Sequence, residues 1–105
     1  MSRVIGDLRF KNNDKLSPEE QKMTCAPDIT SIDLKGVDFI IVACDGIWDV
    51  LSNQQVVDFI ENNLKEQPDV KLSVILKRMF ERIISKEGIG VGSDNMSAII
   101  IDLRV

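Results

Sequence analysis

Residues 39–49 read FIIVACDGIWD, and this stretch decides the fold of the 105-residue chain. From Val37 to Cys44 the sequence is β-branched and almost wholly apolar, which predicts a strand buried on both faces. Asp45-Gly46 follows at once and is typical of a turn at the end of a strand. A strand that is buried on both faces has a layer above it and a layer below it, so we expect a central strand.

Two other apolar segments are candidate neighbours of this strand. Residues 28–34 alternate between polar and apolar side chains and continue through Lys35-Gly36 into the first strand, which predicts a β-hairpin. Near the end of the chain, residues 96–103 form a second apolar run and predict a last strand.

Two helices are predicted between these strands. Ser52 is a favourable N-cap for a helix over residues 53–66. Pro68-Asp69 begins a second helix that runs to about residue 87 and ends at Gly88. Both segments carry apolar residues at the spacing of one helix face. Packing on a hydrophobic core is the commoner meaning of such stripes, so we expect both helices to cover a core.

The polar segment 11–27 is predicted to be a mobile surface loop. Ser17, Pro18 and Glu20 fit the capping box of a short helix. Pro27 lies close downstream and limits such a helix to one or two turns. We therefore expect loop structure through most of this segment.

The composition excludes several functional classes. Seventeen Asp and Glu residues against thirteen Lys and Arg residues give a net charge of −4, which argues against binding to nucleic acids or membrane surfaces. The chain contains no histidine, so Ser-His-Asp catalysis, Cys-His catalysis and His-ligated zinc cannot come from this chain alone. Chemistry based on the Asp and Glu carboxylates is not excluded.

Cysteine usage and the absence of targeting patterns predict the compartment. Cys25 and Cys44 are too few for a disulfide framework and too far apart for a CxxC motif, and Cys44 is expected to be a buried free thiol. The first residues show no apolar signal-peptide segment, and no window is apolar enough for a transmembrane helix. We therefore expect an intracellular protein, in the cytoplasm or the nucleus.

Two aspartates mark the ends of the predicted strands. Asp45 follows the first strand and Asp94 precedes the last one, so antiparallel pairing would place both at one rim of the sheet. Carboxylates at close range repel unless a cation lies between them, and Mg²⁺ or Mn²⁺ prefers oxygen ligands. Asp49 is then a ligand, a supporting acceptor or a helix cap. Asp-Gly and Ser-Asp-Asn are also ordinary turn and loop sequences, so an ordinary structural role stays open.

Three short segments carry a family resemblance. Residues 2–7 read SRVIGD, residues 45–49 read DGIWD and residues 92–97 read GSDNMS. In this order they resemble the Ser-Arg-x-x-Gly-Asp, Asp-Gly-x-Trp-Asp and Asp-Asn-Met-[Ser/Thr] motifs of the metal-dependent protein serine/threonine phosphatases, the PP2C or PPM family. The resemblance covers essentially the whole chain.

The resemblance implies Mg²⁺- or Mn²⁺-dependent hydrolysis of phosphoserine and phosphothreonine in phosphoprotein substrates, by water activated at a binuclear centre. The implied fold class is α+β, part of a four-layer α/β/β/α sandwich in which antiparallel sheets are flanked by helices. By the same resemblance, Asp45 and Asp94 are metal ligands, while Asp49, Asn95 and Gly46 support the site.

The resemblance also assigns residues 11–27 to a flap-like loop beside the active site. The residues expected to influence substrate access there are Lys11, Asn12, Asn13, Asp14 and Lys15. Residues 1–105 then form the C-terminal portion of a catalytic domain, and we expect its N-terminal half, with the other metal ligands, to lie outside this chain. The isolated chain is expected to be inactive, with sheet edges that favour self-association. The alternative is a pseudo-phosphatase that serves as a non-catalytic interaction module.

Overall fold

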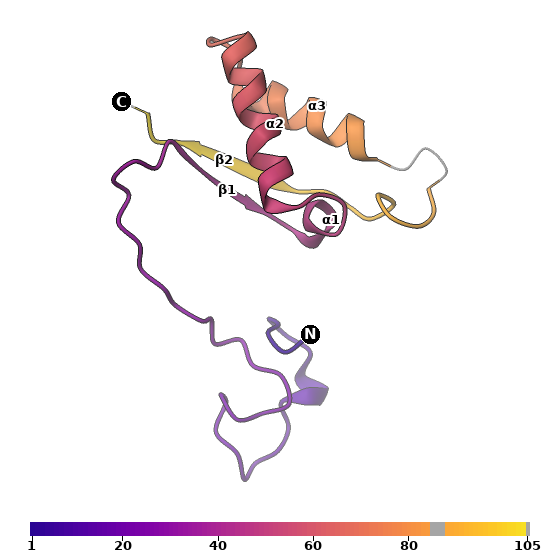
Figure 1. The fold of residues 1–105 in the computed structure, drawn as a ribbon. Helices are drawn as coiled ribbons and strands as arrows, with labels where there is room; N and C mark the ends of the chain where they lie inside the picture. Colours follow the sequence, from indigo (N-terminus) through magenta and orange to yellow (C-terminus); the bar gives the residue numbers. More distant parts are fainter. Residues whose placement is uncertain (85–87, 105) are drawn as a thin grey trace. The chain divides into compact units, whose positions relative to one another are not determined.

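The computed structural model describes residues 1–84 and 88–104. The chain forms two compact units, Met1–Leu34 and Lys35–Val105. The elements of the second unit are β1 (Phe39–Ala43), α1 (Asp45–Trp48), α2 (Asn53–Glu66), α3 (Leu72–Ile83) and β2 (Ala98–Asp102) (Figure 1). This combination of helices with antiparallel strands confirms an α+β fold.

The sheet joins the beginning of the second unit to its end. β1 and β2 run antiparallel, and Ile41 lies opposite Ile100 in their register. Ile100 is buried in the core, and Phe39, Ile41 and Ala43 pack against that core from β1. The antiparallel pairing on which the shared rim of Asp45 and Asp94 depends is therefore present.

The opposite face of the sheet, called the outer face below, is open. It consists of the four apolar residues that alternate with the core-facing ones, Ile40, Val42, Ile99 and Ile101. Val42 is 55% exposed, Ile99 61% and Ile101 45%. Within the second unit the prediction that β1 is buried on both faces is wrong, because α2 and α3 lie over the same face of the sheet (Figure 1).

The core lies between the sheet and the two long helices. α2 begins where the sequence predicts, because a capping box forms at its start. The backbone N–H of Gln55 donates to the Ser52 hydroxyl at 3.3 Å, and the backbone N–H of Ser52 donates to the Gln55 side-chain oxygen at 2.9 Å. Both apolar stripes face inward, as predicted, except that Ile84 lies beyond the end of α3 and is 54% exposed. The buried apolar side chains are Ile47, Val56, Ile60, Leu64, Ile75, Met79, Ile83 and Ile100.

α3 is shorter than the sequence predicts. A turn at Pro68-Asp69 precedes the helix, which begins only at Leu72. At its other end Ile84 has extended backbone angles (φ −64°, ψ 130°), so the helix stops before Gly88. Residues 85–87 of the predicted helix lie outside the described residues. Among the described helices, none has the length and apolarity needed to cross a membrane.

The hairpin predicted for residues 28–34 is wrong. All of these residues are described, and they form no strand. Ile29 is 83% exposed and Ile32 is 74% exposed. An alternating pattern specifies a strand only where a neighbouring strand and a core stabilise it, and here the apolar side chains have no core to enter.

The segment 11–27 lacks regular helices and strands, as predicted, and side-chain hydrogen bonds organise it. The Gln21 amide group donates to the Asn13 carbonyl at 2.7 Å and accepts from the Asn13 N–H at 3.1 Å. The Ser17 N–H donates to the Glu20 carboxylate at 3.1 Å, which closes a turn rather than opening a helix. The mobility of the loop stays a prediction.

The SRVIGD motif forms a turn in the first unit. Gly6 and Asp7 have φ angles of +83° and +54°, in the left-handed region that glycine and aspartate tolerate best. A short 3₁₀ helix, Leu8–Phe10, follows this turn. Arg3 forms an isolated parallel bridge with Thr24, so the motif ties the base of the loop together.

Candidate metal centre

One rim of the sheet brings the DGIWD and GSDNMS motifs together. The ladder ends with Ala43 opposite Ala98, and the Cys44 N–H donates to the Ser97 carbonyl at 3.1 Å, one residue pair further. α1 begins directly after β1, beside the segment that leads into β2 (Figure 1). The strands therefore place the two motifs next to each other at the backbone level.

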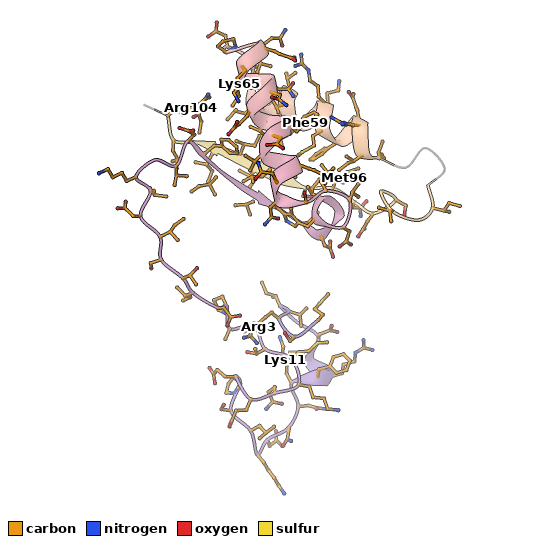
Figure 2. All side chains as sticks on the ribbon, viewed as in Figure 1. Arg3, Lys11, Phe59, Lys65, Met96 and Arg104 are labelled. Carbon is orange, nitrogen blue, oxygen red and sulfur yellow. The ribbon has the colours of Figure 1, made fainter. Side chains whose placement is uncertain are left out.

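Gly46 packs directly on the backbone of Asn95. A Cβ atom at Gly46 would overlap the Asn95 carbonyl oxygen and lie 3.1 Å from its carbonyl carbon. Met96 lies beside α1 (Figure 2), with its Cγ 3.5 Å from the same Cβ position. Only glycine permits this approach. Asp45 directly precedes Gly46, and Asp94 directly precedes Asn95. Both aspartates therefore belong to the same closely packed rim.

The three candidate carboxylates are exposed at this rim. The Asp94 carboxylate accepts from the Asn95 N–H at 2.7 Å, which fixes it to its own loop. Asp45 is the first residue of α1, and its carbonyl accepts from the Asp49 N–H at 2.8 Å. Asp49 is the C-cap of α1, so its backbone has one of the three roles considered for this residue, that of a helix cap. The role of its carboxylate stays a prediction.

Two further residues hold the rim, Trp48, which the family resemblance predicts to pack beneath the site, and Cys44, which the sequence did not link to it. The indole N–H of Trp48 donates to the Ala43 carbonyl at 2.9 Å, and its side chain packs against the core. The thiol of Cys44 contacts backbone groups of both Asn95 and Ser97. Cys44 is half-buried rather than buried, because it lies at the rim and not within the sheet. The apolar run before it gave no signal for this contact.

The two ends of the sheet differ in whether a basic side chain pairs with the carboxylates there. At the far end, hydrogen bonds from Arg104, at 2.9 and 2.6 Å, hold the pKa of the Asp102 carboxyl down at about 2. Arg104 and Lys65 mark that end in Figure 2. None of the ion pairs between described residues involves Asp45 or Asp94. The described chain thus supplies a cation for Asp102 but none for the rim.

The donor chemistry of the rim fits a hard divalent cation. Asp45 and Asp94 offer carboxylate oxygens, which Mg²⁺ and Mn²⁺ prefer. Within residues 1–84 and 88–104, no three acidic or thiol side chains gather closely enough to hold an ion by themselves. Two carboxylates would therefore supply part of a coordination shell, and other oxygen donors would have to complete it.

The flap-like residues belong to the first unit. The Lys11 ammonium donates to the Val4 carbonyl at 2.7 Å, and the Lys15 N–H donates to the Asn13 side-chain oxygen at 3.1 Å. Asn12 and Asp14 are exposed. Their predicted influence on substrate access stays a prediction.

Comparison with known families identifies the family of this chain. The sequence model of the family described as protein phosphatase 2C matches residues 1–90, most of the chain. The chain belongs to the protein phosphatase 2C family. This PP2C membership confirms the family resemblance, with the motifs at residues 2–7 and 45–49 inside the matched range, and it identifies the parent family as protein phosphatases, which are hydrolases.

Curated PP2C relatives match nearly the whole chain. Probable protein phosphatase 2C 42 of Oryza sativa subsp. japonica is 45% identical over 102 residues, which cover 96% of this chain and 28% of the rice protein. Protein phosphatase 2C homolog 2 of Saccharomyces cerevisiae is 44% identical over 111 residues, covering 98% of this chain and 23% of the yeast protein. Protein phosphatase 1G of Homo sapiens is 40% identical over 108 residues, covering 96% and 20%. The PP2C chain thus spans less than a third of the length of these relatives.

Proposed function

We propose that the protein to which this chain belongs hydrolyses phosphoserine and phosphothreonine in intracellular phosphoproteins of the cytoplasm or nucleus, with Mg²⁺ or Mn²⁺ as cofactor. The observation that carries the proposal is the packing of Gly46 on Asn95, which brings an aspartate from each of two PP2C motifs to one rim.

Each residue of the rim has a separate task in this proposal. Asp45 and Asp94 would hold metal from adjacent segments, and the Asn95 N–H keeps the Asp94 carboxylate oriented. Gly46 lets the two segments approach, and Asp49 would accept a hydrogen bond from a metal-bound water. Divalent ions, when bound, lower the pKa of a water molecule, orient the phosphate and neutralise its charge. No covalent protein nucleophile is required.

We also propose that residues 1–105 are the C-terminal portion of a four-layer α/β/β/α catalytic domain. The open outer face supports this proposal, because a row of four β-branched side chains, three of them exposed, is suited to packing on a second sheet. The N-terminal half of the domain would supply that sheet and the remaining metal ligands. In this arrangement residues 11–27 form the flap-like loop that influences substrate access.

A second candidate is a catalytically silent interaction module. It is favoured by the observation that the described residues gather no complete set of metal ligands. For the isolated chain we propose inactivity, and self-association through its sheet edges. For the longer protein, the retained aspartates at the rim favour catalysis, because a binding module has no need of them.

A chimera tests the proposed function. In it, this chain replaces the matching residues of yeast protein phosphatase 2C homolog 2. We expect the chimera to hydrolyse a phosphoserine peptide with Mn²⁺ and to lose that activity when EDTA removes the metal, while the isolated chain stays inactive. A folded chimera without activity would favour the interaction module, and full activity in EDTA would contradict the metal proposal.

The proposed sandwich predicts that one substitution has different effects in two contexts. In the isolated chain, Ile99→Lys should change the free energy of unfolding by less than about 0.5 kcal/mol, because Ile99 is 61% exposed. In the chimera, the same change would bury an unpaired ammonium and should cost about 2 kcal/mol. Urea unfolding of both proteins measures the difference. Val74→Lys, on the exposed side of α3, is the control, and equal effects of Ile99→Lys in both contexts would rule out a second sheet.

A further inference from the structure

The last pair of opposed residues in the sheet, Cys44 and Ser97, forms only one of its two backbone hydrogen bonds. In an antiparallel pair of strands, every second pair of opposed residues exchanges two N–H···O bonds, and the register makes Cys44 and Ser97 such a pair. The Cys44 N–H donates to the Ser97 carbonyl at 3.1 Å, but the Cys44 carbonyl accepts instead from the Ile47 N–H at 3.1 Å. The chain turns into α1 at this residue, so the carbonyl has left the sheet and the returning Ser97 N–H needs another acceptor.

The thiol of Cys44 takes the place of that carbonyl. Its sulfur accepts from the Ser97 N–H at 3.2 Å, and the S–H donates to the Asn95 carbonyl at 3.4 Å. One thiol provides one donor and one acceptor, so both capacities are used. The Asn95 carbonyl is also the group on which Gly46 packs. The thiol and the glycine therefore fix the same peptide unit from two sides.

We propose that Cys44 is a positioning residue for the metal centre, and this inference rests on the proposed function. The thiol replaces the Cys44 backbone carbonyl as the acceptor for the Ser97 N–H. The carbonyl is then free to accept from α1, which can begin immediately after β1. By binding the Asn95 carbonyl, it holds the loop that carries Asp94 beside the segment that carries Asp45. The thiol itself binds no metal and takes no part in the reaction.

Hydrogen exchange in the 105-residue chain tests the contacts of the thiol directly. Cys44→Ala should speed exchange of the Ser97 amide by about tenfold, because its acceptor is gone. Cys44→Ser keeps a donor and an acceptor at the same position and should restore slow exchange. Cys25→Ala, which changes the exposed thiol of the first unit, should leave the Ser97 amide unaffected.

Metal affinity in the chimera tests the positioning role. Residues that orient metal ligands change affinity by about 10–100-fold when they are replaced. We expect Cys44→Ala to raise the Mn²⁺ dissociation constant, measured by electron paramagnetic resonance, about tenfold. At saturating Mn²⁺, kcat should stay within about twofold of the parent, and Cys44→Ser should restore the affinity. A merely structural role would lower the melting temperature without changing the dissociation constant.

The outcomes separate this inference from the proposed function. If the chimera requires Mn²⁺ but Cys44→Ala leaves both the dissociation constant and Ser97 exchange unchanged, the inference is wrong and the function stands. If Ser97 exchange responds while the dissociation constant does not, the thiol stabilises the sheet only, and the positioning role is overturned. A chimera that is active without divalent metal overturns the proposed function and the inference together.

Discussion

Asp45→Asn and Asp94→Asn should each lower kcat/KM of the Mn²⁺-loaded chimera by at least about a hundredfold. The amide keeps the shape of the side chain but removes the negative charge that a divalent cation requires. Replacing residues that only orient metal ligands already costs about 10–100-fold, so loss of a ligand should cost more. Both side chains are exposed, and we expect the free energy of unfolding to change by less than about 0.5 kcal/mol.

Two measurements make this expectation specific to the rim. Steady-state kinetics with a phosphoserine peptide give kcat/KM, and electron paramagnetic resonance gives the Mn²⁺ dissociation constant. Asp58→Asn is the matched control, because Asp58 is an exposed aspartate on α2 that accepts only from the Gln54 side chain among the described contacts. Asp49→Asn should have a smaller effect, about tenfold. If Asp45→Asn and Asp94→Asn retain the activity of the control, the aspartates are not ligands.

The sequence predicted the parts of the fold that depend on local chemistry. α2 begins at the predicted residue because its capping box involves only Ser52 and Gln55, three positions apart. The core-facing stripes of both helices were also predictable, since helical periodicity is a property of adjacent turns. The two apolar runs were recognised as strands, and their pairing, across about half of the chain, was the condition for the predicted rim.

The errors arose where a pattern depended on parts of the molecule that sequence does not place. Residues 28–34 alternate as a strand would, yet Ile29 and Ile32 find no core. The apolar run of β1 indicated two buried faces, but the second unit by itself covers only one of them. We attribute this mismatch to the second sheet proposed above, because sequence records the burial that a strand has in its complete domain.

The candidate site was predictable in its acidic residues and not in its packing. Motif positions identified Asp45 and Asp94, and the antiparallel register places them at one rim. The contacts of the Cys44 thiol depend on where a carbonyl points after the chain turns, which no residue pattern encodes. Gly46 was predicted as a supporting residue through a motif, whereas the structure gives the physical reason, which is the Asn95 backbone beside it.

Gly46→Ala should destabilise the chain by about 3 kcal/mol, at the upper end of what an inserted methyl group costs in a packed site. The added Cβ would overlap the Asn95 carbonyl oxygen, and that oxygen is backbone, so no side-chain rotation relieves the contact. Helix propensity alone would have the opposite sign, because alanine in place of glycine stabilises a helix by up to about 1 kcal/mol. A lower free energy of unfolding would therefore indicate the overlap with Asn95, and a higher one would indicate that helix propensity dominates.

Urea unfolding of the 105-residue chain measures this change, and the chimera shows its consequence for the rim. Relief of the overlap requires the Asn95 peptide to move away from α1, which would carry Asp94 away from Asp45. We expect the Mn²⁺ dissociation constant to rise at least about tenfold in parallel with the loss of stability. Gly36→Asn is the control, because its added Cβ meets nothing within 4 Å and asparagine tolerates its φ of +78°. A Gly46→Ala chain as stable as the parent would show that the two motifs are not packed as described, and the shared rim would lose its support.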